Sequence, residues 1–194
     1  MPSYDPNTAL IIVDVQNDFG DPGGGLYVAG GENVVPVANA EVEAALRSGA
    51  TVVYTQDWHP ANTPHFAKDG GVWPVHCVGE TWGAQLHPGL RVDGEVFRKG
   101  SNGEDGYSGF TMRDPVSGEE SSTGLIEYLR ERDITAAVVL GLATDYCVKA
   151  TALDAARHGL ATTLLTTGIR AVNLQPGDGE AAIEEMRAAG VLIE

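Results

Sequence analysis

A cysteine, an aspartate and a lysine occur in this sequence where a nucleophile, a base and a stabilising cation could meet. Cys147 follows the apolar run 136–140 and precedes residues spaced as on one helix face, with Thr144 as the expected N-cap. Unpaired N–H groups and the dipole at a helix start favour a thiolate over a thiol. Cys147 is therefore a candidate nucleophile, and the alternative is a small buried hydrophobic residue, as many free cysteines are.

Two further ionisable residues end predicted strands. Asp14 follows a continuous apolar run, and Lys99 closes a shorter strand pattern. Because the carboxyl ends of parallel strands meet at one edge of a sheet, we expect both side chains to approach Cys147. Asp14 could then accept the thiol proton and return it to a leaving amine, while Lys99 could stabilise the thiolate. Backbone N–H groups near Ala143 and Cys147 could hold an oxyanion. The alternatives are a turn-capping Asp14 and a solvated Lys99 at the rim.

A Pro- and Trp-rich connection after the second predicted strand concentrates the residue types that bind metals. Asp57 and His59 are two residues apart, so their side chains share a side if the chain is extended there. With His65 or His76 folded over them, they would form an open site for zinc, iron, manganese or nickel. The alternative is a loop that Asp–His hydrogen bonds hold together without a metal. Cys77 is either a further ligand or, as we expect, a structural thiol.

Alternating strand and helix patterns place these residues in one doubly wound α/β domain of three layers, α/β/α, spanning residues 1–194. Continuous apolar runs predict about six strands in a mainly parallel sheet, at 9–14, 50–55, 95–99, 136–140, 160–167 and 191–193. Helical spacing predicts helices at 32–48, 123–132, from 145 onward, and at 178–189 with Asp178 as the cap. Segment 82–90 could include a short helix, and 113–122 is expected to be a surface excursion.

The Gly-rich segment 16–31 lacks the spacing of a phosphate-binding fingerprint. It is interpreted as flexible backbone, in which Phe19 is the one large apolar residue near Asp14. No organic cofactor is therefore expected.

The charge balance excludes some partners. The 194 residues include 12 Lys plus Arg against 27 Asp plus Glu, a net charge of −15, which argues against nucleic acid and anionic membranes. No run of about 18 apolar residues predicts a spanning helix, and the polar start of the chain shows no export signal. Two cysteines fit a reducing cytoplasm better than a disulfide framework. We therefore expect a cytoplasmic protein that binds neither nucleic acid nor membrane.

Several short segments form a specific combination, in order, over nearly the whole chain. They are 13–19 (VDVQNDF), 57–60 (DWHP), 65–66 (HF), 73–77 (WPVHC), 98–100 (RKG), 107–110 (YSGF) and 141–147 (GLATDYC). Together they resemble the nicotinamidase/pyrazinamidase enzymes, which belong to the isochorismatase-like cysteine hydrolases. The combination is far more specific than any one of its motifs.

The resemblance implies a reaction and the residues that perform it. The reaction is hydrolysis of nicotinamide, and of analogues such as pyrazinamide, to the carboxylic acid and ammonia through a cysteine thioester, in NAD salvage. The implied catalytic residues are Asp14, Lys99 and Cys147. The implied oxyanion hole consists of the N–H groups of Ala143 and Cys147, beside a cis peptide between Ala143 and Thr144.

The resemblance also implies how an aromatic amide substrate is held. One divalent metal ion, such as zinc, iron or manganese, would bind the pyridine nitrogen and orient the ring. Its implied ligands are Asp57, His59 and His76. His65 is a further ligand in some members of the family, and its spacing also allows it to support a ligand without binding the metal. The ring would lie against Phe19, Trp73, Tyr107 and Tyr146.

Other functions remain open from the sequence. Another cysteine amidase of the superfamily, acting on a carbamoyl or other amide, would keep the three catalytic residues, but such enzymes lack the metal cluster. A true isochorismatase would lack the cysteine. A non-catalytic binding module on the same fold would be expected to have lost at least one of the three residues. A homo-oligomer is compatible with any of these functions.

Overall fold

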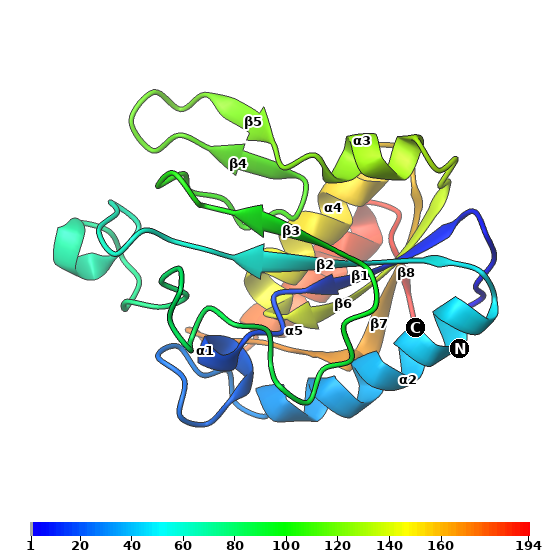
Figure 1. The fold of residues 1–194 in the computed structure, drawn as a ribbon, viewed down its shortest axis with the longest axis horizontal. Helices are drawn as coiled ribbons and strands as arrows, with labels where there is room; N and C mark the ends of the chain where they lie inside the picture. The colour runs from blue at the N-terminus through cyan, green and yellow to red at the C-terminus, as the bar shows by residue number, and fades with distance from the viewer. Residues whose placement is uncertain (1) are drawn as a thin grey trace.

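Six parallel strands form the central sheet of the computed structural model, which describes residues 2–194 (Figure 1). In spatial order the strands are β3 (Glu95–Lys99), β2 (Thr51–Asp57), β1 (Thr8–Val13), β6 (Ala136–Leu142), β7 (Ala161–Arg170) and β8 (Leu192–Ile193). Every neighbouring pair is parallel. The chain adds strands on one side of β1 and then on the other, which confirms the predicted doubly wound α/β fold.

Helices cover both faces of this sheet. α2 (Val34–Arg47) lies along one face, while α3 (Leu125–Arg130), α4 (Lys149–Arg157) and α5 (Asp178–Ala188) lie on the other. α1 (Asn17–Gly20) and the 3₁₀ turns Gly31–Asn33 and Ala67–Asp69 belong to the connections. Within residues 2–194 no helix combines the length and the apolar character that crossing a membrane requires.

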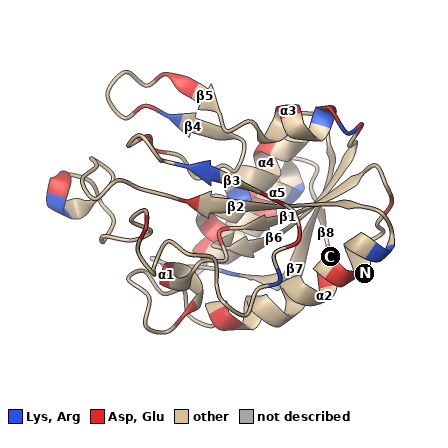
Figure 2. Cartoon of the chain, in the orientation of Figure 1, with Lys and Arg blue, Asp and Glu red and all other residues tan. Residues whose placement is uncertain are grey.

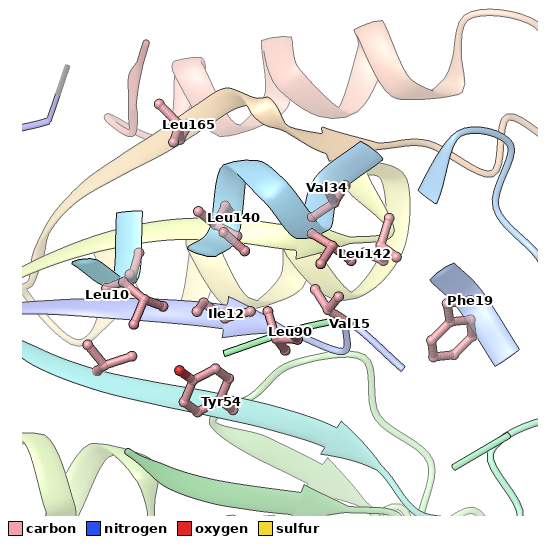
Figure 3. Packing of buried hydrophobic residues seen from close by; sticks show 14 of the residues in the cluster. Leu10, Ile12, Val15, Phe19, Val34, Tyr54, Leu90, Leu140, Leu142 and Leu165 are labelled. Atoms are coloured by element: carbon pink, nitrogen blue, oxygen red, sulfur yellow. The ribbon is translucent and has the colours of Figure 1, made fainter. Parts of the chain in front are cut away.

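The sheet divides the hydrophobic core in two, because successive side chains of a strand point to opposite faces. On β1, Leu10 and Ile12 pack toward α2, together with Tyr54 of β2 and Leu140 of β6 (Figure 3). The odd-numbered residues of β1 pack toward α3, α4 and α5. All six residues of β1 are buried, so its continuous apolar run is what burial on both faces requires.

Some predicted boundaries shift in the structure. Three strands predicted to end at 55, 140 and 167 continue to Asp57, Leu142 and Arg170, because the backbone pairing continues beyond the apolar pattern. The helix predicted over 32–48 begins at Val34, after a 3₁₀ turn. Gly177, not Asp178, is the N-cap of α5, and Asp178 is its first residue.

Two connections also differ from expectation. The prediction of a short helix within 82–90 is wrong, because the segment forms turns. The Gln16 side chain donates a hydrogen bond to the carbonyl of Ala84 at 2.8 Å. Because a side chain supplies a hydrogen bond to this backbone carbonyl, the carbonyl does not need a partner within a helix. The surface excursion over 113–122 contains a hairpin of β4 (Thr111–Arg113) antiparallel to β5 (Glu120–Ser122).

The close approach of β6 to β1 yields a stability prediction. Gly141 lies opposite Val13, has φ 129°, and a Cβ added there would lie 2.1 Å from the Val13 carbonyl oxygen. Gly141→Ala should therefore push the central strands apart and lower the free energy of unfolding by about 4 kcal/mol or more, measured by urea denaturation.

Gly159→Ala is the matched control. Gly159 also has a positive φ, 86°, but a Cβ there would meet nothing within 4 Å. Gly159→Ala should lower the free energy of unfolding by about 1–2 kcal/mol, which is the cost of the left-handed conformation without a clash. Equal losses in the two variants would contradict the close approach.

Candidate active site

The candidate catalytic residues lie where the strand order reverses. β1 has β2 on one side and β6 on the other, and the carboxyl ends beside such a reversal are where open α/β sheets bind ligands. Asp14 directly follows β1, Cys147 lies in the turn after β6, and Lys99 ends β3. The structure brings these three residues together at this edge, as the sequence predicted.

Lys99 is the centre of the group. Its Nζ lies 2.9 Å from Oδ2 of Asp14, 2.8 Å from Oδ1 of Asp57 and 3.4 Å from Sγ of Cys147. Lys99 and Asp57 are partners in the β2–β3 register, so the basic end of β3 adjoins the acidic end of β2 (Figure 2). The Lys99 side chain is 1% exposed, which excludes a solvated rim charge.

The two carboxylates keep the buried lysine charged. Burial alone would lower the pKa of Lys99, but the charges of Asp14 and Asp57 raise it well above its ordinary value. Burial raises the pKa of Asp14, although Lys99 opposes this rise. The Thr55 hydroxyl donates to Oδ1 of Asp14 at 2.6 Å and fixes that carboxylate. Asp14 is thus a carboxylate of increased proton affinity, held beside a permanent cation.

Burial of Cys147 works against ionisation of its thiol. Burial raises its pKa well above the ordinary value, and the charge of Lys99 opposes that rise without reversing it. The effect expected of the helix start, which favours a thiolate, is thus opposed by the loss of water around the sulfur. Nucleophilic chemistry at Cys147 requires a base to remove the proton.

The turn that carries Cys147 differs from the prediction in two details. Residues Thr144–Val148 form a single π-helical turn before α4, and its N-cap is Ala143. Thr144 lies inside that turn, so it cannot be the cap. The cis peptide joins Leu142 to Ala143, one bond earlier than the resemblance implied.

Three histidines form a buried cluster beside this centre. His59, His65 and His76 each offer a possible metal-binding atom, and these atoms all lie within 4.8 Å of one another. Asp57 adjoins two of them, since its Oδ2 lies 3.4 Å from Nε2 of His59 and 3.7 Å from Nε2 of His76. Gly100 leaves room for the cluster, because a Cβ there would lie 2.8 Å from Nδ1 of His59.

The donor set fits a divalent cation. Neither ring nitrogen of His59 has a hydrogen-bond partner within residues 2–194, although both are buried. Unpaired buried nitrogens are costly unless something else binds them. Imidazoles with a neighbouring carboxylate are the ligands that zinc, iron and manganese accept in proteins. Asp–His contacts hold part of this loop, since His65 contacts Asp105, but they leave the His59 nitrogens without a hydrogen-bond partner.

A narrow pocket opens onto both the cysteine and the histidines. It has an empty volume of about 360 Å³, mouth included, and the four predicted aromatic residues all line it: Phe19, Trp73, Tyr107 and Tyr146. Trp73 donates its indole N–H to the Tyr107 hydroxyl at 3.1 Å, and its ring meets that of Tyr146 edge-on at 4.8 Å. Asp57, His65, His76, Ala143 and Cys147 line the same pocket. Flat aromatic walls above a thiol suit a planar substrate.

Sequence reasoning missed other residues around the pocket. Leu26 lines it from the Gly-rich loop, which is therefore more than flexible backbone, and Val172 lines it just beyond β7. The strand-end rule that identified Asp14 could have identified Val172. Leu26 had no comparable signal, since it begins a short apolar run within a Gly-rich loop and neither a strand end nor a periodic pattern marks it. Asp18 ties that loop to the histidine segment by accepting hydrogen bonds from the N–H groups of Gly25 and Cys77, at 2.8 and 2.7 Å.

Comparison with known proteins agrees with this geometry. Residues 8–194 match the family model described as the isochorismatase domain, and the chain belongs to this family. It is 42% identical to a nicotinamidase of Escherichia coli, over 97% of this chain and 94% of the relative. These findings confirm the resemblance that the motifs indicated.

Solved structures with the same fold contain relevant ligands. A pyrazinamidase of Pyrococcus horikoshii in complex with zinc is 39% identical, covers 97% of this chain and 99% of its own, and has a TM-score of 0.86. The protein PnC1 of L. infantum in complex with nicotinate is 38% identical and has a TM-score of 0.89. The match covers 100% of this chain and 95% of the PnC1 chain.

The shared charge of Lys99 can be tested by its effect on stability. Lys99→Gln leaves the carboxylates of Asp14 and Asp57 buried without a cation, and should lower the free energy of unfolding by about 3–5 kcal/mol. Arg47→Gln breaks an ion pair with Glu43 in which both side chains are more than half exposed. It should change stability by about 0.5 kcal/mol or less. A similar small effect of both substitutions in urea denaturation would mean that Lys99 does not neutralise the site.

Proposed function

We propose that this protein hydrolyses nicotinamide, and analogues such as pyrazinamide, to the carboxylic acid and ammonia through a thioester on Cys147, as a step of NAD salvage. One observation carries the proposal: a single buried ammonium, that of Lys99, contacts the candidate base, the candidate nucleophile and a carboxylate of the histidine cluster. The similarity to nicotinamidases and pyrazinamidases over the whole chain supports the choice of substrate.

The first step is removal of the thiol proton. Because burial raises the pKa of the Cys147 thiol, the sulfur becomes nucleophilic when the Asp14 carboxylate accepts its proton. The raised proton affinity of Asp14 favours that transfer, and the Lys99 ammonium stabilises the negative charge as it moves to sulfur. The three residues therefore act as one proton-transfer unit without a histidine.

The remaining steps exchange the amine for water. The thiolate of Cys147 attacks the carboxamide carbon, and the N–H groups of Ala143 and Cys147 hold the negative oxygen that forms. Asp14 returns its proton to the departing nitrogen, so the carbon–nitrogen bond breaks, ammonia leaves and a thioester remains. Asp14 then takes a proton from water, the hydroxide attacks the thioester, and the acid is released as the thiol regains its proton.

The pocket favours a flat aromatic amide over a flexible one. Phe19, Trp73, Tyr107 and Tyr146 provide aromatic surface, and the hydrogen bond between Trp73 and Tyr107 keeps two of these walls in place. A planar ring stacks well on such walls and loses little conformational freedom on binding. The carboxamide of that ring would then face Cys147.

A divalent cation would be held by His59, His65 and His76, with Asp57 alongside. When bound, it would supply a Lewis-acid contact for the pyridine nitrogen and so orient the ring. The chain's own residues perform the acyl transfer. A carbamoyl amidase has no use for this cluster, which favours the pyridine substrate over that alternative.

Replacement of the nucleophile tests the reaction directly. Cys147→Ala should reduce ammonia release from nicotinamide by about 10³-fold or more, because no thioester can form. The variant should keep its far-ultraviolet circular dichroism and its bound metal, since Cys147 belongs to neither the sheet nor the histidine cluster. Appreciable turnover by a folded Cys147→Ala variant would refute the covalent mechanism.

Metal content tests the second half of the site. We expect elemental analysis to find a bound metal ion in the unmodified chain. His59→Ala removes a central imidazole of the cluster, so that ion should be missing from the purified variant. His87→Ala is the control, because His87 is partly buried but lies outside the cluster. Unchanged metal content in His59→Ala would show that the site is misassigned.

A further inference from the structure

His65 has a polar partner that the mechanism above does not use. Its Nδ1 contacts Oδ1 of Asp105, 40 residues later in the chain. The His65 ring is 6% exposed, whereas the Asp105 side chain is 47% exposed. The contact therefore lies where the buried histidine cluster reaches the surface.

The position of Asp105 is fixed by its backbone. Its N–H donates to the Arg113 carbonyl at 2.7 Å, and its carbonyl accepts from the Arg113 N–H at 2.5 Å. At the next residue, Gly106, a Cβ would lie 3.0 Å from the Thr111 carbonyl, so this segment packs directly against β4. The carboxylate is thus presented from an anchored segment and not from a free loop.

A carboxylate beside Nδ1 determines the tautomer of the ring. Ionised Asp105 can only accept a hydrogen bond, so Nδ1 of His65 carries a proton, and in the neutral ring Nε2 then keeps its lone pair. His76 is held in the same way, because its Nδ1 lies 2.7 Å from the Pro74 carbonyl oxygen, which also can only accept. In both rings, Nε2 is the nitrogen left for a metal.

We propose that Asp105 is a positioning residue of the metal site: it fixes His65 in the Nδ1–H tautomer and holds the ring within the cluster of His59 and His76. The inference rests on the metal role in the proposed function. Asp105 acts through His65 and does not line the substrate pocket. Tyr107, two residues after Asp105, accepts a hydrogen bond from Trp73. The segments 65–73 and 105–107 are therefore joined at two points beside that pocket.

Two readouts that do not depend on turnover test the proposal. The first is long-range proton–nitrogen NMR of the histidine side chains in metal-free protein, which distinguishes Nδ1–H from Nε2–H rings. The second is the zinc dissociation constant, measured by competition with a chelating dye. The variants are Asp105→Ala, Asp105→Asn and, as a control on the same segment, Glu104→Gln, whose carboxylate bonds to Asn102 and not to the histidines.

The expected result is an Nδ1–H ring at His65 in the unmodified chain and zinc binding about 10–100-fold weaker in Asp105→Ala. Asp105→Asn should lose less affinity, because its amide oxygen still accepts from Nδ1, and Glu104→Gln should bind zinc normally. An Nε2–H ring at His65 in the unmodified chain, or unchanged zinc affinity in folded Asp105→Ala, would overturn the proposal. Normal zinc binding without ammonia release from nicotinamide would instead refute the proposed function and leave this inference standing.

Discussion

The buried ammonium of Lys99 is the interaction on which the rest of the site depends. Two carboxylates, those of Asp14 and Asp57, lie within 3 Å of it and could not both remain ionised in a dry interior without a cation between them. The fold provides this arrangement directly, because β3 ends opposite the last residue of β2 and β1 ends beside them. The position of one lysine thus determines the charge state of the whole sheet edge.

That shared charge makes the proposed acyl-transfer residues and the histidine cluster one electrostatic unit. Asp57 faces Lys99 with one oxygen and His59 and His76 with the other. Lys99 also contacts the sulfur of Cys147, and burial raises the pKa of that thiol. In the proposed mechanism, burial favours the thiol form of Cys147, so activation depends on the neighbouring base Asp14.

The sequence predicted the sheet and the approach of Asp14, Lys99 and Cys147 because both follow from continuous apolar runs and the common edge of parallel strands. It could not predict that burial raises the pKa of Cys147, since burial depends on everything packed around the sulfur. Leu26 and Asp105 also escaped prediction. Each lies in an irregular segment, where neither periodicity nor a strand end marks the residues that point toward a pocket or a histidine. The cis bond was misplaced by one residue because the motif does not specify which peptide of the turn is constrained.

The most direct test of the account is ammonia release from nicotinamide by the purified protein, before and after its metal is removed by a chelator. The account predicts release by the untreated protein, loss of release once elemental analysis shows that the metal is gone, and recovery when zinc, iron or manganese is added back. Release that continues unchanged after complete removal of the metal would contradict the role assigned to the histidine cluster. No release by metal-loaded protein with Cys147 reduced would contradict the assignment of nicotinamide as substrate.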